Sequence, residues 1–102
     1  MRLTDRQQQM IKESVIEVFG DAATIRLFGS RVDDGKRGGD IDLYLEVPSV
    51  PDPDTTLLDR KAHLLRVLWQ RLGAQRIDLL IRTSQQPLSS IHRDALEHGV
   101  LL

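Results

Sequence analysis

The chain of 102 residues contains no cysteine. This absence excludes disulfide frameworks, thiolate zinc sites and cysteine nucleophiles. No apolar run approaches the roughly 18 residues that a membrane-spanning helix needs, and residues 1–15 lack the apolar stretch of a secretory signal. The formal net charge is only −1, so no strong field draws the protein to nucleic acid. We therefore expect a cytoplasmic protein that neither contacts membranes nor binds nucleic acid strongly.

The residues that are present are those of a folded protein. Hydrophobic residues make up 40% of the chain and charged residues 28%, a balance typical of globular rather than disordered sequences. The length is close to that of an average domain and is sufficient for one hydrophobic core. We expect a single domain over residues 1–102.

Helical and alternating patterns follow one another along the chain. Apolar residues at helical spacing predict helices over 5–19 and 55–72, and a last helix with Pro87 at its first position and Gly99 just past its end. Alternation of apolar and polar residues predicts strands over 24–28 and 40–47, and a mainly apolar run predicts a third strand over 76–82. The order predicts a mixed α/β (α+β) fold, in which helices flank one small mixed sheet of three or more strands.

Three further features have mainly structural interpretations. Trp69 lies at helical spacing with neighbouring leucines, so we expect it in the core, whereas an exposed Trp69 would indicate an interface. The apolar tail 100–102 is expected to pack on this domain or on a partner. His63, His92 and His98 have no partner at metal-ligand spacing, and we expect them to be structural or on the surface.

Three aspartates form the candidate catalytic and metal-binding site. Asp40 and Asp42 lie two apart on a strand, so their side chains leave the same face with Cα atoms about 6.5–7 Å apart. Asp78 interrupts an otherwise apolar strand. If that strand neighbours the first, all three carboxylates share one face, and we expect Tyr44 and Glu46 on the same face at the rim of the site. Such oxygen ligands suit Mg²⁺, or Mn²⁺, rather than zinc.

A second candidate site directly follows the strand 24–28. Gly29 lets the backbone bend and approach a phosphate closely, and Ser30 adds a hydroxyl and an N–H group. Arg31 can neutralise phosphate charge with its forked donors. Because Mg²⁺ usually completes its shell with substrate phosphate and water, the two sites together predict a nucleoside triphosphate substrate.

These motifs resemble a known enzyme family. The segments 27–31 (LFGSR), 39–43 (GDIDL) and 77–79 (IDL) resemble the nucleotidyltransferase superfamily of DNA polymerase beta, and most closely its minimal nucleotidyltransferases. Gly39 departs from the pattern, because the family often has Ser or Thr there. The resemblance covers residues 24–82 by motif.

The resemblance implies a role for each residue of the motifs. Asp40 and Asp42 would bind two Mg²⁺ ions, and Asp78 would hold the ion that binds the attacking hydroxyl and would help to accept its proton. Gly29, Ser30 and Arg31 would grip the outgoing phosphates. The implied reaction is transfer of a nucleoside monophosphate, AMP from ATP, to a hydroxyl acceptor.

The acceptor is expected on another molecule, since 102 residues leave no room for the helical domain that holds it in larger relatives. Minimal nucleotidyltransferases often pair with a helical HEPN partner, as antitoxin and ribonuclease toxin. The resemblance therefore implies AMP transfer to a tyrosine of a HEPN-type toxin. Two alternatives stay open: a non-catalytic module that masks a partner through Val100–Leu102 and its helix faces, or a nucleotidyltransferase with a small-molecule acceptor or, less in keeping with the near-neutral charge, an RNA end.

Overall fold

The computed structural model describes residues 3–29, 41–48, 56–73 and 75–102. In this part of the chain the elements, in order, are α1 (Asp5–Phe19), β1 (Thr24–Phe28), β2 (Ile41–Val47), α2 (Leu57–Leu72), β3 (Ile77–Thr83), α3 (Ser90–His98) and β4 (Val100–Leu101). The predicted succession of helices and strands is confirmed, and the short strand β4 is added to it. The fold is mixed α+β, as the sequence predicts.

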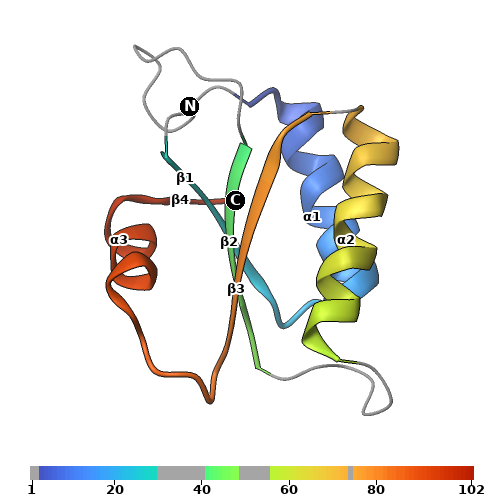
Figure 1. The fold of residues 1–102 in the computed structure, drawn as a ribbon. Helices are drawn as coiled ribbons and strands as arrows, with labels where there is room; N and C mark the ends of the chain where they lie inside the picture. The colour runs from blue at the N-terminus through green and yellow to red at the C-terminus, as the bar shows by residue number, and fades with distance from the viewer. Residues whose placement is uncertain (1–2, 30–40, 49–55, 74) are drawn as a thin grey trace.

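The strands form one mixed sheet in the order β3-β2-β1-β4 (Figure 1). Strand β1 runs antiparallel to both β2 and β4, whereas β2 and β3 are parallel. Helix α2 connects the two parallel strands. The third predicted strand therefore lies beside the second, which is the condition for the aspartates to share a face.

The main core lies between the sheet and the helices α1 and α2, which pack side by side on one of its faces (Figure 1). Alternate residues of β1 and β2 point into this core, and Leu27, Leu43 and Leu45 are completely buried there. Helix α3 lies on the other side of the sheet and contacts β1. No helix in the described ranges is long and apolar enough to cross a membrane.

Helix α1 begins at a capping box that the sequence predicts. The backbone N–H of Gln7 donates to Thr4 Oγ1 at 3.0 Å, and the backbone N–H of Thr4 donates to Gln7 Oε1 at 2.9 Å. These two bonds satisfy donors that the first turn of a helix leaves free. The helix ends at Gly20, which has a φ of +88°. Local sequence therefore sets both ends of α1.

The expectation that Trp69 lies in the core is wrong. Helix α2 faces the core through Leu64 and Leu68, which are completely buried. Trp69 follows Leu68 and is turned by about 100° around the helix axis, so its side chain is 45% exposed. Its indole Nε1 donates to the backbone oxygen of Gln75 at 3.0 Å. Trp69 thus links α2 to Gln75 instead of filling the core.

The C-terminal segment differs from the prediction at its start. Helix α3 begins at Ser90, so the prediction of Pro87 at its first position is wrong. Ser89 is the N-cap, and its backbone N–H donates to His92 Nδ1 at 3.1 Å. The apolar tail packs on its own domain: Leu102 N–H donates to the Ile25 oxygen at 2.9 Å, and the Leu102 side chain packs against the core.

Candidate active site

The described part of the chain includes half of the predicted site residues. Gly29, Asp42 and Asp78 are described. Ser30, Arg31 and Asp40 lie outside the described residues, so their predicted roles stay predictions. The geometry of the candidate site is therefore built from the first three.

Asp42 and Asp78 are direct neighbours on adjacent parallel strands. The backbone hydrogen bond from Ile41 N–H to the Arg76 oxygen, at 2.9 Å, helps to fix this register. Adjacent strands lie about 4.8 Å apart, and side chains in register leave the same face. Asp42 is half-buried and Asp78 is exposed. Two carboxylates at this spacing repel each other, and a shared cation would relieve that repulsion.

Gly29 brings the end of β1 against the same carboxylate. Phe28, the last residue of β1, pairs with Asp42 across the antiparallel ladder. The next residue, Gly29, has a φ of +78°. A Cβ atom at this position would lie 3.1 Å from Asp42 Cγ and would collide with Asp42 Oδ2. The positive φ therefore favours glycine here, and the lack of a Cβ lets the Gly29 backbone lie close to the Asp42 carboxylate without displacing it.

The donor set suits a hard divalent cation. Both side chains offer carboxylate oxygens, and this type of ligand favours Mg²⁺ or Mn²⁺. Within the described ranges, no group of three acidic, histidine or cysteine side chains gathers at one point. Asp40, the predicted third carboxylate, lies outside those ranges.

No protein-family model and no curated protein matches this chain. A proposal for its function therefore rests on the motifs and the chemistry of its own residues.

A buried tyrosine occupies the sheet face that carries the aspartates. Sequence alternation predicts Tyr44 on the rim of the site, but Tyr44 is completely buried, so this expectation is wrong. Helix α3 covers it, and His92 stacks on its ring with centroids 5.6 Å apart. The Tyr44 hydroxyl has no hydrogen-bond partner among the described residues. Burial, and next the negative charge of Glu46, raise the pKa of Tyr44 to about 12.

Glu46 lies between two arginines on the same face. Arg82 Nη1 contacts Glu46 Oε2 at 2.9 Å, and Arg26 Nη1 lies 3.5 Å from Glu46 Oε1. Arg26 and Arg82 thus both form ion pairs with the same carboxylate. The cluster consists of one carboxylate and the two guanidinium groups that contact it. It links β1, β2 and β3 on the face opposite the main core.

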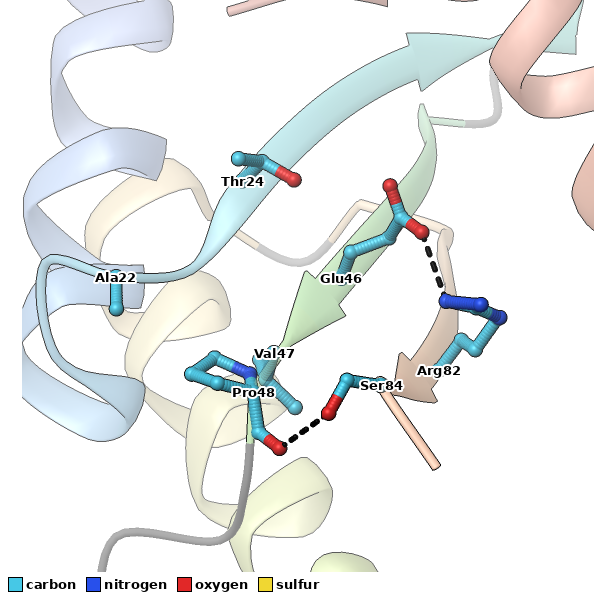
Figure 2. Close-up of a pocket in the computed structure, with 7 residues that line it drawn as sticks. All are labelled: Ala22, Thr24, Glu46, Val47, Pro48, Arg82 and Ser84. Atoms are coloured by element: carbon cyan, nitrogen blue, oxygen red, sulfur yellow. Dashed lines mark hydrogen bonds and ion pairs between the residues drawn. The ribbon is translucent and has the colours of Figure 1, made fainter. Parts of the chain in front are cut away.

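A hollow of about 300 Å³ lies beside this cluster (Figure 2). It is lined by Ala22, Thr24, Glu46, Val47, Pro48, Arg82 and Ser84. Asp42 lies four residues before Glu46, which corresponds to about 13 Å along a strand. The hollow and the aspartate pair therefore lie towards opposite ends of β2. Sequence alone does not reveal this cluster, because only the register between β2 and β3 places Glu46 beside Arg82.

Proposed function

We propose that this chain is a magnesium-dependent nucleotidyltransferase that transfers AMP from ATP to a hydroxyl acceptor. The observation that carries the proposal is the register of Asp42 with Asp78, with the backbone of Gly29 against the Asp42 carboxylate. An acidic pair beside a glycine turn offers cation ligands and a close approach for phosphate at one place. The mixed α+β sheet is consistent with a nucleotidyltransferase-like fold.

Asp42 and Asp78 would hold the magnesium, joined by Asp40 as the sequence predicts. Carboxylate oxygens fit this hard cation, which keeps positions for water and substrate phosphate. Bound magnesium would neutralise triphosphate charge and stabilise the attacking and leaving oxygens. Because Gly29 lacks a Cβ, its backbone can lie beside Asp42 without displacing the carboxylate.

The residues of the chain would bind the nucleotide and accept a proton. Gly29 and Ser30 would offer backbone N–H groups to the outgoing phosphates, and Arg31 would add its guanidinium. The acceptor oxygen would attack the α-phosphorus while the bond from that phosphorus to the bridging β-phosphate oxygen breaks. Pyrophosphate would leave, and the proton of the hydroxyl would pass to a carboxylate oxygen of Asp78. Positioning of the two reactants would supply much of the acceleration.

We propose a tyrosine on a HEPN-type toxin in the cytoplasm as the acceptor. The family resemblance of the motifs supports this part of the proposal. Coexpression with such a toxin separates catalysis from steric masking: an enzymatic antitoxin loses protection when Asp40→Asn and Asp42→Asn are combined, whereas a masking antitoxin keeps it. The masking alternative relies on Val100–Leu102. Two of these residues form β4, which pairs with β1 within the same domain.

The decisive experiment is label transfer in a lysate of the organism that encodes the chain, with magnesium. ATP labelled at the α-phosphate is compared with ATP labelled at the γ-phosphate. We expect a protein band labelled only from the α-position, lost with Asp42→Asn and kept with Asp21→Asn. Asp21 is exposed in the turn before β1 and controls for the loss of one negative charge. A band labelled only from the γ-position would indicate a kinase, and the absence of any band would contradict the proposal.

A further inference from the structure

Strand β3 has an open outer edge. It is the last strand of the sheet order β3-β2-β1-β4, and in the described part of the chain no strand pairs with its outer side. On the inner side, Ile41 N–H donates to the Arg76 oxygen and Ser84 N–H donates to the Val47 oxygen. Even-numbered residues of β3 therefore bond to β2, and odd-numbered residues point their N–H and C=O groups outwards. Such an edge is a template for another strand.

The free length of this edge ends at Thr83. The Thr83 N–H donates to Gln86 Oε1 at 2.9 Å, and the Gln86 N–H donates to the Thr83 oxygen at 3.1 Å. Gln86 thus satisfies the outward groups of Thr83. The outward N–H and C=O groups of Ile77, Leu79 and Ile81 lie before Thr83 on the strand, and these are the groups that a partner strand would meet.

An apolar groove of about 360 Å³ runs between this edge and α2. Its lining is Leu57, Leu58, Lys61, Leu79, Leu80 and Ile81. Leu58 is 74% exposed, which is high for a leucine that borders a groove. Lys61 is the one charged residue of the lining, and its long stem can pack along apolar surface while its amine stays in water. A partner strand with apolar side chains fits this groove.

We propose that the occupant is a second copy of this chain, whose β3 pairs antiparallel with β3 around Leu80. An antiparallel partner must meet the outward odd-numbered residues with odd-numbered residues of its own. The register centred on Leu80 places Leu79 opposite Ile81 and Leu80 opposite Leu80, whereas a register centred on Leu79 would place Arg82 opposite Arg76. The N–H and C=O groups of Leu79 and Ile81 would then bond across the dimer axis in both copies. The groove and the exposed Leu58 would be covered at the same time.

Charge favours a second copy in this orientation. Asp78 and Arg82 lie at equal distances along the strand from Leu80, so each aspartate would face an arginine of the other copy. A parallel arrangement in register would instead place like charges opposite each other, which is destabilising. Arg82 bonds Glu46 through Nη1 and its Nε is buried, so Nη2 is the nitrogen that would donate in this contact. The dimer is argued without nucleotidyl transfer, but both proposals use Asp78: the arginine of the other copy would lie beside the carboxylate that would hold magnesium.

Residue 80 gives a direct test because it faces itself in the proposed dimer. The mass of the full-length chain is measured by sedimentation over the micromolar range, for the wild type and for Leu80→Lys and Leu80→Glu. We expect the wild type to approach twice the 11.6 kDa of one chain, and each variant to stay at the single mass. An equimolar mixture of the two variants should regain the doubled mass, since opposite charges then meet at the axis. Ile91→Lys on α3, where Ile91 is 52% exposed, is the matched control and should remain dimeric.

Circular dichroism verifies that each variant is folded. If the substitutions at Leu80 prevent folding, Leu58→Lys replaces them, because Leu58 is largely exposed and should tolerate charge. A wild type that stays at the single mass throughout would overturn the proposal and indicate a different occupant. Variants at residue 80 that remain dimeric, or a mixture that stays at the single mass, would also overturn it.

Discussion

Replacing Gly29 with alanine perturbs the candidate site through one added methyl group. The φ of Gly29 is +78°, and a left-handed conformation costs a residue with a Cβ about 1–2 kcal/mol. The added Cβ would also collide with Asp42 Oδ2, so the aspartate must leave its present conformation. An off-rotamer side chain costs about 1 kcal/mol. The sum, about 2–3 kcal/mol, corresponds to a fall in Tm of roughly 10–20 °C for a domain of this size.

The substitution should also slow catalysis, because the displaced carboxylate belongs to the candidate site. A displacement of about 1 Å in a reacting group can reduce the rate about 100-fold. We therefore expect Gly29→Ala to remain folded at 25 °C while label transfer falls by about two orders of magnitude. Gly20→Ala is the control, because Gly20 has a φ of +88° with nothing within 4 Å of its Cβ position. It should lose stability and keep activity.

A double-mutant cycle isolates the contact between Gly29 and Asp42 without an activity assay. In an Asp42→Ala background the atoms that collide are absent, and the remaining Asp42 Cβ would lie at an ordinary 3.4 Å. The cost of Gly29→Ala in chemical denaturation should then fall by about 1 kcal/mol. An equal cost in both backgrounds, or wild-type transfer by Gly29→Ala, would refute the argument that this glycine makes room for the carboxylate.

Three further outcomes follow from the same face of the sheet. Asp42→Asn should abolish label transfer while the protein stays folded, because the carboxylate beside Asp78 is replaced by a neutral amide of the same size. The protein has one tyrosine, so absorbance at the phenolate band should report a pKa of Tyr44 of about 12, and a value near 10 would contradict its burial. Because this pKa is raised in the folded state, the stability that burial of the neutral phenol contributes is complete below pH 10 and is lost as the pH rises through 12. Glu46→Ala should cost about 1–3 kcal/mol in denaturant unfolding, since Arg82 is only 15% exposed and would lose its counter-charge; an unchanged stability would mean that the cluster contributes little.

Local sequence determined the elements whose signals lie within a few residues. The capping box of Thr4 and Gln7 and the glycine at position 20 give α1 the range that was predicted, 5–19. Alternation gives β1 its range and places Asp42 on the face opposite the core. The position of Asp78 within an apolar strand was also evident. These features depend on backbone geometry with a fixed repeat, so a short window of sequence is sufficient.

Contacts between distant segments were decided by the tertiary structure. Alternation placed Tyr44 beside Asp42 but could not show that α3 buries it under His92, because burial depends on how α3 returns to the sheet. The sequence also could not show that Trp69 is exposed. Its exposure depends on which face of α2 packs against the core, and that face carries Leu64 and Leu68. Pro87 and Ser89 are both residue types that favour the start of a helix. The bond from the Ser89 N–H to His92 Nδ1 is consistent with Ser89 as the N-cap.

The candidate site combines both kinds of information. The sequence determined which residues carry carboxylates and where a glycine turn follows a strand. Only the parallel register of β2 with β3 brings Asp42 beside Asp78, and only the pairing of β1 with β2 brings Gly29 against Asp42. The physical reason is that side-chain type and local alternation are properties of a segment, whereas register and close approach are properties of two segments folded together.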